Sequence, residues 1–269
     1  MRLIAPLLLG LASCVSAAGS SGAPIRILVY NIHAGKDAGG VDNLERVADI
    51  VRNSQAQVVL LQEVDNRTRR SGGVDQLARL RELTGLNGVF GRTIDYDGGE
   101  YGISILSRGQ ITTSRFIELP VELADSASRA RYEARGALMA KIADASGELR
   151  VIDTHLDAGR GDSNRVQQTN ALVFFANAAQ DSGLTLLGGD LNSEPDSRVA
   201  ALLAQNGWKD LFAMCGGSNG FSFPADKPVK RIDFLFVKSR ASCRTASVLD
   251  TQASDHRPVL FEVIRNARD

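Results

Sequence analysis

Polar side chains that can bind metals or move protons stand at or beside the ends of several apolar runs in this chain. The runs have the length and the β-branched content of buried strands. Packing does not require a carboxylate, an amide or an imidazole where such a run ends. Six of these positions in one chain therefore predict an active site. They are Asn31, Glu63, His155, Asp190 with Asn192, Asp233, and Asp255 with His256.

The chemistry of these residue types points to phosphoester hydrolysis assisted by a divalent cation. A hard ion such as Mg²⁺ prefers oxygen ligands, and Glu63, Asn31 and Asp255 suit such a shell. An imidazole oriented by a carboxylate can act as a general base or as a charged donor. Taken singly, an Asp-x-Asn is most often a turn, and a histidine after a strand is most often structural; His33 stays in that class. A zinc hydrolase is disfavoured because the chain has three histidines and no His-x-His or His-Glu-x-x-His run.

Seven short motifs follow one another in a fixed order. They are Tyr30-Asn31-Ile32-His33, Leu61-Gln62-Glu63-Val64, Gly102 to Arg108, Asp153-Thr154-His155-Leu156, Gly188 to Ser193, Arg231-Ile232-Asp233-Phe234 and Ser254-Asp255-His256. The ordered set resembles the endonuclease/exonuclease/phosphatase superfamily, which includes deoxyribonucleases, sphingomyelinases and inositol-polyphosphate 5-phosphatases. The resemblance covers about residues 25 to 265 and implies a four-layer α/β sandwich with the site at one end of two sheets.

The resemblance also implies a role for each site residue. It gives Glu63 the main metal-ligand role, with Mg²⁺ or Mn²⁺ as the cofactor. Asp190 would orient or deprotonate the attacking water, and Asn192 would donate to the phosphoryl oxygens. His256 would be paired with Asp233. His155 would be paired with a glutamate, as in the deoxyribonuclease-like branch, and Glu100 is the candidate. The glycines before Asp190 are expected to allow close approach of the backbone to a ligand.

The elements expected around these motifs form a single α/β domain over residues 25–269. Helical spacing predicts helices from about Leu44, over Asp75–Thr84, from the Asp162-Ser163 cap, and over Arg198–Gln205. Further strands are predicted at Val89–Thr93, Ile103–Ser107, Ile111–Leu119, Ala137–Ile142, Leu149–Thr154, Ile232–Val237, Arg244–Val248 and Val259–Ile264. Strands outnumber helices, which favours a four-layer α/β/β/α sandwich with two packed mixed sheets.

The N-terminus predicts export. Arg2 precedes an apolar stretch, Leu3–Leu11, that is too short to span a bilayer, so residues 1–18 have the form of an export signal and residues 19–24 of a short tether. Two processing patterns compete. Cleavage after small residues would release a periplasmic or extracellular protein, whereas a lipoprotein signal ending before Cys14 would anchor it by a lipid. The two remaining cysteines, Cys215 and Cys243, are either a disulfide or two buried thiols.

The charge balance bears on the substrate. Lysine plus arginine and aspartate plus glutamate both number 31, so no overall field attracts nucleic acid. Two arginine clusters, Arg67-Arg69-Arg70 and Arg129-Arg131-Arg135, either line the site or face solvent. A small or headgroup-like phosphoester is therefore favoured over nucleic acid, and we expect a monomer. The alternatives are a nuclease of the same fold and an inactive member that binds a lipid headgroup or a protein; the complete set of catalytic positions disfavours the latter.

Overall fold

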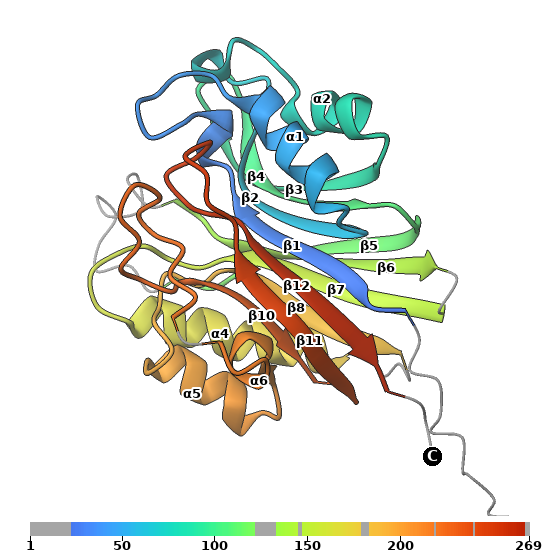
Figure 1. Ribbon diagram of the computed structural model, residues 1–269. Coiled ribbons are helices and arrows are strands. Elements are labelled where there is room, and N and C mark those ends of the chain that lie inside the picture. The colour runs from blue at the N-terminus through green and yellow to red at the C-terminus, as the bar shows by residue number, and fades with distance from the viewer. Residues whose placement is uncertain are drawn as a thin grey trace, which may run out of the picture.

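Two six-stranded sheets pack face to face, with helices on both outer faces (Figure 1). The computed structural model describes residues 23–121, 133–144, 147–178, 183–217, 219–238 and 240–266, so the predicted export signal, Cys14, most of the tether, Arg129 and Arg131 lie outside it. The first sheet has the order β11-β12-β1-β2-β4-β3 and the second β5-β6-β7-β8-β10-β9. Both contain parallel and antiparallel pairs, so the predicted four-layer sandwich of mixed sheets is confirmed.

The strand bounds agree with the predicted runs to within a few residues. In the first sheet they are β1 Ile25–Asn31, β2 Val58–Asn66, β3 Asn87–Tyr96, β4 Gly99–Ser107, β11 Ala241–Val248 and β12 Val259–Arg265. In the second they are β5 Gln110–Glu118, β6 Gly136–Asp144, β7 Gly147–His155, β8 Leu184–Asp190, β9 Lys209–Asp210 and β10 Asp233–Val237.

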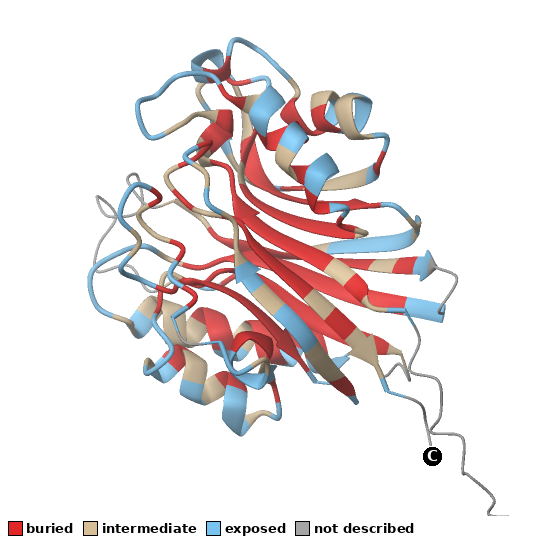
Figure 2. Cartoon of the chain, viewed as in Figure 1, coloured by how far each residue is buried: buried red, intermediate tan, exposed pale blue. Residues whose placement is uncertain are grey.

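Alternate side chains of the central strands enter different cores. In β1, Ile27 and Val29 pack between the two sheets, whereas Leu28 and Tyr30 pack beneath the helices of the first sheet. A third core lies between the second sheet and its own helices. Because both faces of these strands are buried (Figure 2), their sequences are continuous apolar runs rather than alternating ones.

The helices cover the outer faces and begin where polar residues cap them. The helices α1 Leu44–Ser54 and α2 Gln76–Thr84 lie on the first sheet, and α4 Ser163–Ala178 and α5 Arg198–Gln205 on the second (Figure 1). Asp75 and Ser197 accept hydrogen bonds from backbone amides in the first turns of α2 and α5. No helix among the described residues is long and apolar enough to cross a membrane.

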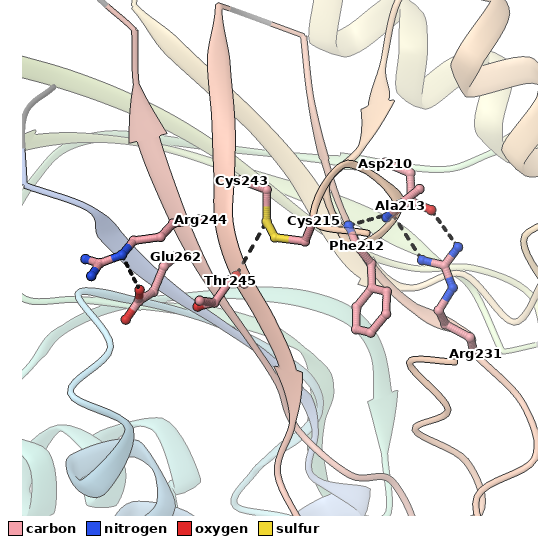
Figure 3. The surroundings of a disulfide bond; sticks show 9 residues. All are labelled: Asp210, Phe212, Ala213, Cys215, Arg231, Cys243, Arg244, Thr245 and Glu262. Carbon is pink, nitrogen blue, oxygen red and sulfur yellow. Dashed lines mark hydrogen bonds and ion pairs between the residues drawn. A yellow bond between two sulfur atoms is a disulfide. The ribbon is translucent and has the colours of Figure 1, made fainter. Parts of the chain in front are cut away.

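A disulfide joins Cys215 to Cys243, so the predicted pairing is present in the structure (Figure 3). Cys215 ends the short helix α6, Leu211–Met214, and Cys243 lies in β11 at the edge of the first sheet. The short helix follows directly after β9, at the edge of the second sheet. The bond therefore links the edges of the two sheets covalently.

Candidate active site

Asn31 and Glu63 lie at one end of the first sheet, where the parallel strands β1 and β2 bring their polar residues together. Asn31 is completely buried, and its side-chain amide donates to Glu63 Oε1 at 3.0 Å and to Asp190 Oδ2 at 3.1 Å. Glu63 has a positive φ of 58° within an irregularity of the pairing between β2 and β4. Such a backbone is uncommon for a residue other than glycine and occurs often at functional sites.

Asp190 is the centre of the site. It ends β8, beside His155 at the end of the parallel strand β7 and opposite Asp233 at the start of the antiparallel strand β10. Its Oδ2 atom lies 3.5 Å from His155 Nε2 and 3.6 Å from His256 Nε2. Its Oδ1 atom accepts a hydrogen bond from the Asn192 backbone amide at 2.9 Å. Burial raises the pKa of Asp190 to about 7, against the opposing charge of His256.

His256 is paired with Asp233, as the sequence predicts. The Nδ1 atom of His256 is 2.9 Å from Asp233 Oδ2, which also accepts a hydrogen bond from the Ser222 hydroxyl. The ring of Phe223 packs against the imidazole with 4.7 Å between the ring centres. Burial alone would lower the pKa of His256, but the carboxylates of Asp233 and Asp190 outweigh it and raise that pKa to about 10. His256 is therefore a charged donor at neutral pH.

His155 has a different partner from the one predicted. Its Nδ1 atom is 3.0 Å from Nη1 of Arg135, which lies just before β6. Glu100 stands opposite Asn66 in the pairing of β2 and β4, accepts a hydrogen bond from its side chain at 2.6 Å, and does not line the cavity of the site. The expected contact between Glu100 and His155 is therefore absent from the described part of the chain.

The side chains of Glu63, His155, Asp190 and His256 line a cavity of about 330 Å³. Asp255 and Asn192 also line it, so the predicted site residues other than Glu100 are brought together at one place. Sequence reasoning missed several further residues around it: Arg70, Tyr101, Glu133, Arg135 and Phe223 line the cavity, and Ser222 supports Asp233. Only Arg70 and Arg135 carried a signal, because both belong to the two arginine clusters.

Both clustered arginines at the cavity are fixed by carboxylates. Arg70 donates from Nε and Nη2 to the two oxygens of the buried Asp65, and its guanidinium lies over the rings of Tyr96 and Tyr101. Arg135 is 95% buried and bonded to Glu133. The solvent-facing interpretation is therefore wrong for Arg135, whereas Arg67, Arg69 and Arg70 are all exposed.

The glycines before Asp190 serve the packing of strands. A Cβ atom on Gly189 would lie 1.9 Å from the Thr154 carbonyl oxygen of β7, and the φ of this residue is 132°. A Cβ atom on Gly188 would lie 2.6 Å from the Phe234 carbonyl oxygen of β10. These contacts show that the sheet itself requires glycine here, and the approach of a ligand stays a prediction.

The donor set suits a hard divalent cation. Glu63 and Asp255 both present carboxylates to the cavity, and Asn31 is buried beside them with its amide hydrogens already directed at Glu63 and Asp190. Asp190, Asp233 and His256 also lie close enough to hold an ion. In this second group Nδ1 of His256 is engaged by Asp233, and Nε2 of the same ring lies 3.6 Å from Asp190 Oδ2.

The two packed sheets with helices outside, and the polar site at one end of the sheets, define the class as a four-layer α/β sandwich protein. Residues 28–256 match the Endonuclease/Exonuclease/phosphatase family, and the chain belongs to that family. It is 28% identical over 251 residues to the uncharacterized protein YbhP of Escherichia coli K12, covering 88% of this chain and 95% of that protein.

Two solved structures illustrate the shared fold. An endonuclease/exonuclease/phosphatase from Beutenbergia cavernae superposes with a TM-score of 0.72 at 20% identity, covering 91% of this chain and 72% of that one. A mannosyl-6-phosphatase from Bacteroides thetaiotaomicron gives a TM-score of 0.74 at 18% identity, covering 89% and 99%. Members of the family are mostly hydrolases, including phosphatases and nucleases, and are usually dependent on divalent metals.

Proposed function

We propose that this protein is a divalent-metal-dependent phosphoester hydrolase that acts on a small or headgroup-like phosphodiester or phosphomonoester. The observation that carries the proposal is the convergence on Asp190 Oδ2. One buried amide and two imidazoles surround this single carboxylate oxygen, at 3.1, 3.5 and 3.6 Å. Such a group can take a proton from water in the middle of an array of donors, which is what hydrolysis of an anionic ester requires.

Each side chain of the site has a separate role in the proposed reaction. Asp190, whose pKa burial raises to about 7, orients the attacking water and accepts its proton. His256 stays charged because of Asp233, and it donates from Nε2 to the developing charge on the phosphoryl group. Asn192 donates from its side-chain amide to a phosphoryl oxygen. Asn31 holds the carboxylates of Glu63 and Asp190 in place.

Glu63, with Asp255 and Asn31, would hold the cation, for which we propose Mg²⁺ or Mn²⁺. A divalent ion bound there supplies charge neutralisation and Lewis-acid polarisation of the phosphoryl group. The fit lies in the chemistry of the donors, because Glu63 and Asp255 offer carboxylate oxygens to the cavity and none of its described lining residues is a cysteine.

The test is a hydrolysis screen of the purified protein with and without EDTA. Bis-p-nitrophenyl phosphate, p-nitrophenyl phosphate, sphingomyelin, phosphoinositides, RNA and plasmid DNA are compared in Mg²⁺ and in Mn²⁺. We expect turnover of at least one small ester, its loss in EDTA, and its return with added metal. Glu63→Gln should lose about a hundredfold or more, since it weakens the hold on the main electrophile, and excess metal should restore part of the loss. Full activity in EDTA would refute the metal assignment.

The nuclease alternative rests on the fold alone. Of the clustered arginines that the structure describes, Arg135 is buried, Arg70 is bonded to Asp65 and Arg69 to Asp97, so three are already engaged before a long phosphate backbone binds. Efficient nicking of plasmid DNA that persists at high salt would favour a nuclease. Binding of headgroups without turnover of any ester would favour an inactive binding member.

We further propose that the protein is exported and acts as a monomer. The sequence of residues 1–18 supports export, and the disulfide is compatible with an oxidising compartment. Lipid attachment at Cys14 and cleavage near Ala18 remain the two processing alternatives. Mass spectrometry of the mature N-terminus separates them, because only a lipoprotein begins with an acylated cysteine.

A further inference from the structure

His155 lies between two groups that can only donate hydrogen bonds from the atoms that face it. Its Nδ1 atom is 3.0 Å from Arg135 Nη1, and its Nε2 atom is 3.1 Å from Asn192 Nδ2. A neutral imidazole can accept at only one nitrogen, and the charged guanidinium is a stronger donor than the amide, so Nδ1 accepts the hydrogen bond from Arg135. The ring proton of a neutral His155 therefore sits on Nε2.

Arg135 is built to stay in this position. Its side chain is 6% exposed, and Nη1 also donates to Glu133 Oε1 at 2.5 Å. The Nε atom is buried and has no hydrogen-bond partner in the described part of the chain. Burial works against the charge of the guanidinium, but Glu133, Tyr101, Glu63 and Asp190 together outweigh it and raise the pKa of Arg135. Arg135 thus presents a permanent donor to the imidazole.

With the proton on Nε2, the 3.1 Å contact between His155 Nε2 and Asn192 Nδ2 is not a hydrogen bond, and the two groups are donors that lie side by side. The amide of Asn192 is oriented by a second hydrogen bond from Nδ2 to the Leu156 carbonyl oxygen at 3.0 Å, so its nitrogen stays turned towards His155. The carboxylate of Asp190 lies near Nε2, at 3.5 Å. Two adjacent donors at the wall of a cavity are a prepared site for an anionic oxygen.

We propose that Arg135 is a positioning residue that holds His155 as the neutral, Nε2-protonated tautomer, so that His155 and Asn192 donate together to one non-bridging oxygen of the phosphoryl group. The identity of that oxygen rests on the proposed function, whereas the tautomer does not. Burial, Arg135 and His256 all lower the pKa of His155, which agrees with a neutral ring.

The tautomer can be measured directly on the purified full-length protein. In a protein labelled with ¹⁵N-histidine, long-range ¹H–¹⁵N spectra at pH 7.5 report which ring nitrogens carry protons, and a His33→Gln variant helps to assign the three rings. We expect protonation of His155 on Nε2 alone and of His256 on both nitrogens, which makes His256 an internal reference. Protonation of His155 on Nδ1 would overturn the proposal, whether or not any ester is hydrolysed.

Two variants then test whether Arg135 causes this state. Arg135→Lys keeps a donor and should keep the Nε2 tautomer, with kcat within about threefold of the native value. Arg135→Gln offers a carbonyl that can accept from Nδ1, so the tautomer should shift and kcat should fall by about 10- to 100-fold, less than the full loss of a donor. If Arg135→Gln folds and keeps the Nε2 tautomer, the positioning role is refuted.

Arg70→Gln is the matched control. It removes the other carboxylate-held guanidinium of the same cavity, which bonds to Asp65 rather than to an imidazole. The tautomer of His155 should not change in this variant. A shift as large as that in Arg135→Gln would show that the general charge of the cavity, and not the contact with Arg135, sets the tautomer.

Discussion

The two histidines of the site are equally buried yet electrostatically opposite. The Nε2 atoms of His155 and His256 both approach Asp190 Oδ2, at 3.5 and 3.6 Å. On the far side of the ring, however, His256 meets the carboxylate of Asp233 and His155 meets the guanidinium of Arg135. The pKa of His256 is accordingly raised to about 10, while that of His155 is lowered.

Burial lowers the pKa of both rings, so the comparison teaches that the partner of Nδ1 decides the difference between the two histidines. A carboxylate behind the ring makes a charged donor, and a guanidinium makes a neutral one. The site can therefore offer one full positive charge and one weaker hydrogen bond to the same phosphoryl group. The proposed hydrolase should depend unequally on the two.

The largest effect is expected when the imidazoles are removed one at a time. His256→Ala should lower kcat by about a thousandfold or more, because it removes a charged donor to the transition state. His155→Ala should cost about a hundredfold, because it removes a neutral donor. Steady-state kinetics on the best substrate of the screen provide the comparison. Equal losses, or a larger loss for His155→Ala, would break the assigned contrast.

A smaller effect on kcat is expected from changing only Asp233, the carboxylate that is bonded to His256. Asp233→Asn keeps an oxygen near Nδ1 but removes the charge that stabilises the imidazolium, so kcat should fall by about tenfold to a hundredfold. The measurement is the same kinetic assay, with thermal unfolding to check that the variant is folded. A loss as large as that of His256→Ala would mean that Asp233 takes part in the reaction itself.

The smallest expected effect is on the stability of the protein, and it comes from the ionisation of Asp153. Two residues before it, the completely buried Asp153 accepts a hydrogen bond from Gln62 at 2.6 Å across the interface between the sheets. Burial raises the pKa of Asp153 well above its usual value. The stability that its protonated form provides is present below about pH 4 and is lost as the pH rises towards the raised pKa.

Asp153→Asn removes this titration and keeps an oxygen for Gln62. The free energy of unfolding of the variant, relative to the native protein, should therefore improve by about 1 kcal/mol or more between pH 4 and pH 8, since one pKa unit corresponds to about 1.4 kcal/mol. Urea unfolding at both pH values measures it, and turnover should be unchanged. A difference that is independent of pH would show that Asp153 is ionised in the folded protein.

Much of the fold could be predicted because its signals are local. Runs such as Val58–Leu61 and Leu184–Leu187 are buried on both faces, and helix starts such as Asp75 carry their own caps. The convergence of Asn31, Glu63, His155 and Asp190 was also predictable, since the ends of parallel strands meet at one edge of a sheet. Asp233 joins them because its strand runs antiparallel to β8.

What could not be predicted depends on contacts between distant residues. Glu100 lies on the expected strand, but its side chain is paired with Asn66, and the neighbour of His155 comes from the segment before β6 instead. The sequence around Arg135 does not distinguish it from a surface arginine. Its buried position depends on its contacts with Glu133 and His155, which only the folded structure shows. The packing constraint on Gly189 was also beyond prediction, since it is set by the Thr154 carbonyl of another strand.

The disulfide between Cys215 and Cys243 closes the loop that supplies the partners of the charged His256 (Figure 3). The loop it closes, with a sequence separation of 28, contains Ser222, Phe223 and Asp233, which are the residues that hold His256. Closing a loop removes conformational freedom from the unfolded chain. Oxidation of two thiols outside the cavity thus restricts the segment that supplies the counter-ion of the imidazole, and reduction of this bond should destabilise that segment.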